Sequence, residues 1–216
     1  MQGSNPYNDF EITDPKAMRA LAHPVRLAIL ERLQRQGPAT ASQLSPHVGA
    51  TASVTSWHLR HLAGFGLVRD AEPGPDRRER RWEAAARGFR IAIEGEGTGA
   101  GEGTDWSAVR ALAAQMFQQA ADLPRRWLAE TEPRLEPEWL SRAGLSNTGV
   151  VVSPEELDAI EDAIEAVLAP YVLRDRTTPQ PGRRDVRLLR YVLPGAGDGV
   201  AESAAEPNTE PDRDQP

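Results

Sequence analysis

The sequence predicts a mainly α-helical fold with a small β component. Apolar side chains recur at helical spacing in several segments, proline and capping residues mark where those segments begin, and few stretches have the composition of strands. Residues 1–9 are polar, 94–104 carry five glycines, and 194–216 are rich in Pro, Gly, Ala and acidic residues. These three stretches predict a disordered N-terminus, a linker and a disordered acidic tail around two structured segments, 10–93 and 105–193.

Helix starts are clearly marked in the first structured segment. Asp14 stands where a cap is expected, with Pro15 in the first turn, and Pro24 fits the first turn of a second helix. Thr40 followed by Gln43 has the spacing of a capping box for a third helix. These signals predict three short helices before position 49.

A fourth helix is predicted over residues 51–65, directly after a tight turn at Gly49. Leu59 and Leu62 lie at helical spacing and are expected to face inward. Two helices joined by a tight glycine turn are typical of a helix-turn-helix.

A β-hairpin is predicted after the fourth helix. Residues 67–69 have the composition of a short strand, 72–76 are dense in turn formers, and 80–83 can return as the second strand. The segment 10–93 is therefore predicted to be a winged helix-turn-helix domain.

The second structured segment begins with a long helix that starts at Thr104 or Asp105. Pro124 is expected to kink or end this helix, and a short helix is predicted at 137–142. Strands are predicted at 149–152 and 185–193.

A further helix is predicted between those two strands. Ser153-Pro154-Glu155-Glu156 combines a capping box with proline at the first position. The region 105–193 is therefore expected to be a long dimerisation helix followed by a strand-helix-strand unit, serving dimerisation or effector binding.

The start of the fourth helix is the strongest functional signal. Its small and hydroxylated residues would let the backbone approach base edges in a major groove, with longer side chains behind them. The alternative is an ordinary amphipathic surface. The DNA-contacting residues predicted here are Thr51, Ser53, Thr55, Ser56, Trp57 and Arg60.

The hairpin tip carries the most basic stretch of the chain. Arginines there can contact phosphates of the DNA backbone, so DNA contact is predicted for Arg77, Arg78, Arg80 and Arg81. The alternative is a solvated charged loop. Trp82 is expected to pack under the hairpin.

The segments DPKAMRALAHPVRLAILERL, SWHLRHLAGFGLV and RRERRW resemble winged helix-turn-helix regulators of the ArsR family, in a longer actinobacterial type with a C-terminal extension. The resemblance covers about residues 12–90. It implies a homodimeric transcriptional regulator with the fourth helix in the major groove and the wing on the flanking backbone. It also places Arg26 at a position the family keeps basic, for phosphate contact or support of that helix.

The sequence departs from the family's metal sensors. It contains no cysteine, and its four histidines all precede position 62. His58 and His61 would supply two ligands at most, so we expect no metal site and no cofactor.

Composition excludes several classes of protein. The segment 105–193 contains neither His nor Cys, so the familiar nucleophile–base pairs are missing and we expect no catalytic residues and no enzyme activity. Apolar runs are too short for a membrane span or signal peptide. The absence of cysteine suits a reducing, cytoplasmic location.

The net charge of −7 hides a division of the chain. Residues 1–93 hold 13 Lys and Arg against 9 Asp and Glu, whereas residues 94–216 hold 12 against 23. A modestly basic half therefore precedes an acidic half.

These observations predict a DNA-binding transcriptional regulator, expected to be a dimeric repressor that reads a double-stranded operator of twofold character. The dimer interface is expected at Val109, Leu112, Met116 and Phe117, and a small-molecule effector would bind in the C-terminal region. The alternative function is a winged-helix protein-interaction module without specific DNA binding.

Overall fold

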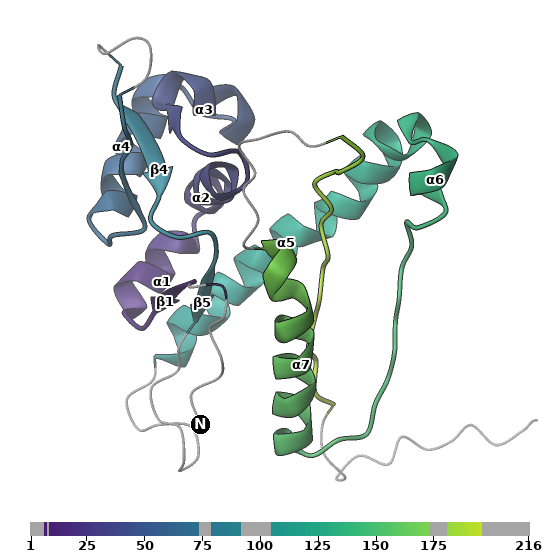
Figure 1. Cartoon of the computed structure of the whole chain (residues 1–216). Coiled ribbons are helices and arrows are strands. Elements are labelled where there is room, and N and C mark those ends of the chain that lie inside the picture. The colour runs from purple at the N-terminus through teal and green to yellow at the C-terminus, as the bar shows by residue number, and fades with distance from the viewer. Residues whose placement is uncertain (1–6, 8, 74–78, 92–104, 173–180, 196–216) are drawn as a thin grey trace, which may run out of the picture. The chain divides into compact units, whose positions relative to one another are not determined.

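The computed structural model describes residues 7, 9–73, 79–91, 105–172 and 181–195. The protein is mainly helical with small sheets and has a winged helix-turn-helix fold (Figure 1). The first part of the chain contains β1 (Phe10–Ile12), α1 (Pro15–Leu21), α2 (Pro24–Gln36), β2 (Ala39–Thr40), α3 (Ala41–Val48), α4 (Ala52–Ala63), β3 (Val68–Asp70), β4 (Arg81–Ala84) and β5 (Phe89–Ile91). We call residues 10–91 the winged domain. The later part contains α5 (Trp106–Glu130), a 3₁₀ turn η1 (Glu132–Arg134), α6 (Pro137–Leu140) and α7 (Pro154–Val172).

The predicted helix starts are confirmed. The carboxylate of Asp14 accepts a hydrogen bond from the Lys16 backbone N–H at 2.8 Å, and Thr40 and Gln43 form both bonds of the capping box. His23 acts as the cap of α2, because its Nδ1 accepts from the Val25 N–H at 3.2 Å. Each cap satisfies backbone donors that the first helical turn leaves without partners.

The turn between α3 and α4 depends on Gly49. Its φ of 65° is in the left-handed region, which a residue with a Cβ enters only at a cost. Thr51 then caps α4, with its Oγ1 accepting from the Val54 N–H at 3.3 Å. The helix predicted over 51–65 is therefore present at 52–63, directly after the tight turn.

The predicted hairpin is confirmed in the described residues. β3 and β4 pair antiparallel, and β2 adds a third strand on the other edge of β4. Trp82 is 2% exposed and lies under the sheet, as expected. The sequence did not predict the second, two-stranded sheet, in which β1 pairs parallel with β5 and Phe10 faces Phe89 in register.

The core joins the winged domain to the start of α5. Ile12, Leu30 and Leu59 come from β1, α2 and α4, and Ala108 and Leu112 of α5 are fully buried in the same cluster. α5 packs mainly against α1 and also contacts α2. The first turns of α5 are therefore part of this core.

The predictions for the C-terminal region were only partly right. α5 continues through Pro124 to Glu130, and α6 and the capping box at Ser153 are confirmed. The strands predicted at 149–152 and 185–193 are wrong, because both stretches lack regular secondary structure. Their apolar residues have no neighbouring strand to pair with, and Val151 is fully exposed.

Most of the predicted disordered N-terminus (residues 1–6 and 8), the whole predicted linker (94–104) and most of the predicted acidic tail (196–216) lie outside the described residues. In the part of the chain that the structure describes, no helix is both long and apolar enough to cross a membrane.

Candidate nucleic-acid interface

α4 divides into a buried face and an outward face. Leu59 and Leu62 are fully buried, as the sequence predicted, together with Thr55 and His58 on the same side of the helix. We define the outward face of α4 by its exposed residues Thr51, Ser53, Val54, Trp57, Arg60 and His61.

The predicted DNA contact of Thr55 is wrong. Its side chain has no exposed surface, and its hydroxyl oxygen is buried without a hydrogen-bond partner. It lies on the inner side of α4 between helices, so it cannot reach DNA. Its small hydroxyl side chain matched the pattern of the neighbouring residues, but the helical period turns it inward.

Trp57 lies near the middle of the outward face and is 55% exposed. Its indole ring contacts His58 edge-on, with ring centroids 4.9 Å apart, and stacks on His61 at 5.6 Å with an interplanar angle of 16°. His61 in turn contacts the ring of Phe65. These contacts hold the indole in place while leaving one side open to a partner.

His58 and His23 support α4 from behind. Their ring centroids lie 4.8 Å apart, and His58 is only 5% exposed, with its Nδ1 buried and without a hydrogen-bond partner. Burial lowers the pKa of His58, and the neighbouring His23, Arg26 and His61 lower it further. Burial also lowers the pKa of His23, and Arg26 adds to the effect. Both rings are therefore favoured in the neutral form.

Arg26 lies beside these histidines and is half-buried. Its Nε is buried without a hydrogen-bond partner, and burial lowers the pKa of its guanidinium. This setting fits support of α4, one of the two roles that the family resemblance offered.

The charges around α4 favour an anionic partner. Residues 41–63 contain no Asp or Glu, and Arg60 is their one Arg or Lys. Arg60 donates from Nη1 to the Ser56 hydroxyl at 2.9 Å, one helical turn back. The side chain is exposed and keeps further donors for a partner.

The arginines at the base of the wing have partners within the chain. Arg80 forms a forked pair with Asp70, at 2.5 and 2.9 Å, and its guanidinium carbon lies 4.1 Å above the centre of the Trp82 ring. Arg81 donates to the Pro38 carbonyl oxygen at 2.9 Å.

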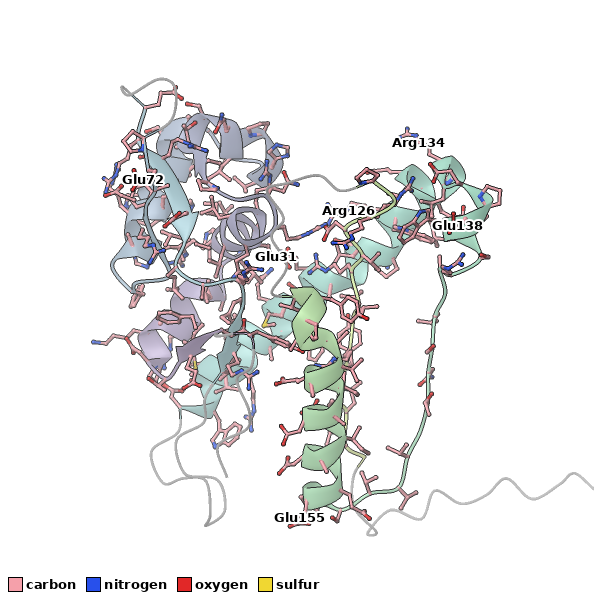
Figure 2. The ribbon with its side chains drawn as sticks, in the orientation of Figure 1. Glu31, Glu72, Arg126, Arg134, Glu138 and Glu155 are labelled. Atoms are coloured by element: carbon pink, nitrogen blue, oxygen red, sulfur yellow. The ribbon has the colours of Figure 1, made fainter. Side chains whose placement is uncertain are left out.

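Both Arg80 and Arg81 therefore fix the base of the wing, and DNA contact by them stays a prediction. Arg77 and Arg78 lie outside the described residues. Glu72, labelled in Figure 2, follows β3 two residues after its end at Asp70.

The four predicted dimer residues divide into two pairs. Leu112 is fully buried within its own chain, so the prediction is wrong for this residue. Val109 is partly buried against the same core, and its place in a dimer interface stays a prediction. Met116 and Phe117, one turn further along α5, are 40% and 47% exposed. Two residues after Phe117, Gln119 of α5 donates to the carboxylate of Glu31 on α2 at 2.5 Å. Figure 2 labels Glu31.

α7 is attached to the strand that follows the wing. Arg90 of β5 pairs with Glu165 at 3.0 Å, and both side chains are mostly buried. The Tyr7 hydroxyl donates to the Glu165 carbonyl oxygen at 3.1 Å, and Arg87 donates to the Val172 carbonyl oxygen. Burial raises the pKa of Asp9, with Glu165 adding to the rise and Arg90 opposing it.

The described residues hold no group of three His, Asp or Glu side chains placed to bind a metal ion. Val54 was not among the predicted DNA contacts, yet it is 45% exposed one turn before Trp57. The signal was available, because once Leu59 and Leu62 are placed inward the helical period turns Val54 outward.

Comparison with known protein families supports the helix-turn-helix within the winged domain. A helix-turn-helix domain family matches residues 21–71, which span α2, α3, α4 and β3. Among solved structures, the chain is similar to a MarR family regulator from Neisseria meningitidis, with 16% identity, a TM-score of 0.30, and coverage of 68% of this chain and 79% of that one. A search of curated proteins found no match.

The resemblance to ArsR regulators stays a prediction. The helix-turn-helix match covers the turn at Gly49 and the whole outward face of α4. Together with the winged fold, it indicates a DNA-binding transcription regulator.

Proposed function

We propose that the protein is a homodimeric transcriptional repressor that places the outward face of α4 in the major groove of its operator. The observation that carries this proposal is the composition of that face. Ser53, Trp57 and Arg60 are exposed on it, and no carboxylate on α3 or α4 would repel phosphates. The wing follows directly and would contact the flanking backbone with Arg77 and Arg78.

The proposed dimer would read an operator of twofold character. In regulators of this type the two reading helices enter successive major grooves, about 34 Å apart or a multiple of that distance. The exposed Met116 and Phe117 of α5 supply an apolar surface for pairing. An effector would act by favouring a dimer in which the two α4 helices are wrongly spaced.

A gel shift with the promoter next to its own gene tests the proposal. We expect a specific complex at low salt whose affinity falls steeply as salt rises, because phosphate contacts release bound counterions. Replacing Arg77, Arg78, Arg80 and Arg81 with alanine should weaken binding and flatten the salt dependence. Arg142→Ala, an exposed arginine outside the winged domain, is the matched control and should bind as wild type.

The proposal fails if no sequence-specific complex forms at low salt. It also fails if the four-arginine variant keeps the wild-type affinity and salt slope.

A protein-interaction module is the second candidate function. It is favoured by one observation, that Val54 and Trp57 expose apolar surface on α4. The two candidates differ in the gel shift, because a module for protein partners would form no complex that a specific competitor DNA removes.

A further inference from the structure

The winged domain exposes two large apolar side chains, and both lie on α4. Among residues 9–73 and 79–91, Val54 and Trp57 are the large apolar side chains that are more than a third exposed, at 45% and 55%. They are three residues apart and therefore neighbours on the helix surface. Apolar side chains gathered on an otherwise polar surface mark a binding site.

Trp57 is held in position before any partner binds. Its ring contacts His58 and His61, and His58 is itself buried against His23. A side chain that is already fixed loses little freedom on binding, so its contact surface contributes more fully to affinity. Val54 is β-branched and stiff at χ1 within a helix, which has the same effect.

The polar groups on the outward face of α4 limit which DNA bases this face can recognise. Acceptor carboxylates, which read the amino group of cytosine, are absent from residues 41–63. Ser53 and Arg60 can donate to bases, and the Trp57 indole has one N–H that can also donate. The Val54 side chain and the carbon face of the Trp57 ring can only contact an apolar group. In the major groove that apolar group is the C5 methyl of thymine.

We infer that Val54 and Trp57 read thymine methyl groups in each half-site of the operator, an inference that rests on the proposed function. Side chains three residues apart on a helix are separated by about 5–6 Å at Cβ. Base pairs are stacked about 3.4 Å apart. The two methyl groups therefore belong to thymines one or two base pairs apart.

The test removes the methyl group alone. The preferred operator is first selected from random duplex DNA with the full-length protein. Each thymine of one half-site is then replaced in turn by uracil, which keeps the hydrogen-bonding groups and lacks the methyl. Fluorescence anisotropy gives the dissociation constant of each duplex. For the wild type we expect a loss of about fourfold at two positions, the ratio for uncovering one methyl-sized group.

The variants Val54→Ala and Trp57→Ala assign each position to a side chain. Each variant should lose the thymine-to-uracil ratio at its own position, where both duplexes then bind equally, and keep the ratio at the other. Val167→Ala is the matched control, because Val167 is an exposed valine on α7 and its removal should leave both ratios unchanged. Val54→Ala changes only surface packing, so the test does not depend on how well Trp57→Ala folds.

The outcomes distinguish a failure of thymine reading from a failure of the proposed DNA-binding function. If an operator is selected but uracil binds as tightly as thymine at every position, the thymine reading is overturned and DNA binding stands. The same holds if both variants keep the wild-type ratios. If no sequence is enriched, the proposed function fails and the inference fails with it.

Discussion

The hydroxyls of Thr51, which precedes α4, and Thr55, within it, differ in their hydrogen bonding. Thr51 uses its hydroxyl to accept the Val54 N–H and so caps the helix. Thr55, one turn later, is buried with its hydroxyl unpaired. A buried polar atom without a partner has lost its hydration and gained nothing in return.

We therefore expect opposite effects from removing the two hydroxyls. Thr55→Val should raise the free energy of unfolding by about 1 kcal/mol, because it removes an unpaired polar atom with little change of shape. Thr51→Ala should lower it by about 1 kcal/mol through loss of the cap. Urea denaturation measures both. A loss of stability in Thr55→Val would mean that its hydroxyl has a partner in solution.

The stacked histidines behind α4 predict a dependence of stability on pH. Burial holds the pKa of both His23 and His58 below the ordinary value of 6.5 in the folded state. As pH falls through 6.5, the unfolded chain binds protons before the folded chain does, so stability that is present above this pH is lost below it. Protonation of His23 would also end its acceptance of the Val25 N–H.

The double variant His23→Asn/His58→Gln tests this origin. Asparagine keeps a cap at the start of α2 and neither new side chain titrates. Melting temperatures measured from about pH 7.5 to 5.5 should fall in the wild type and fall less in the variant. Equal slopes would place the titrating groups elsewhere.

At the scale of elements, the sequence predicted local structure well and distant pairing poorly. A capping box predicts the start of a helix well, because all of its groups lie within four residues. Two of them, Thr40 with Gln43 and Ser153 with Glu156, are present as predicted. The pairing of β1 with β5 joins Phe10 to Phe89, and no local pattern specifies so distant a partner. Residues 149–152 show the converse, because composition typical of a strand does not supply a neighbouring strand.

The ion pair between β5 and α7 is the element-scale contact most open to test. Glu165→Gln should destabilise the docking of α7 by about 1 to 2 kcal/mol, between the values for exposed and fully buried pairs. Hydrogen exchange of the α7 backbone amides would then become faster. Asp162→Asn makes the same change of charge on the exposed side of α7 and should leave exchange unchanged. Unchanged exchange in Glu165→Gln would show that the pair does not hold α7.

At the scale of the whole molecule, the proposed dimer would use apolar side chains that are partly exposed on α5. Phe117→Arg places a charge in the apolar patch of α5, and we expect the dimer dissociation constant to rise by roughly 30-fold, the effect of losing a residue central to an interface. Sedimentation equilibrium measures it. Gln118→Arg adds the same charge at the next exposed position and should have little effect. Equal dissociation constants for Phe117→Arg and wild type would exclude this face of α5.

The candidate site was predictable as a region and less so by residue. The tight turn and the hydroxylated start of α4 indicated this helix as the proposed reading helix, because both are local signals. Residue type alone hid the inward position of Thr55, although the helical period set by Leu59 turns it inward. The packing of Leu112 and the part that Arg80 plays in holding the wing base depend on which neighbour lies against each residue, and no local pattern specifies that neighbour.

The parallel pairing of β1 with β5 also sets the order in which the chain can complete its core during synthesis. Ile12 is synthesised well before Ile91, its partner in the finished protein, where Ile12 is 1% exposed. It has no partner strand until the wing and β5 have left the ribosome, since pairing so distant in sequence closes late. A nascent chain that stops anywhere before β5 therefore exposes β1, an apolar strand, to other chains. β5, the last strand of the winged domain, covers β1, its first.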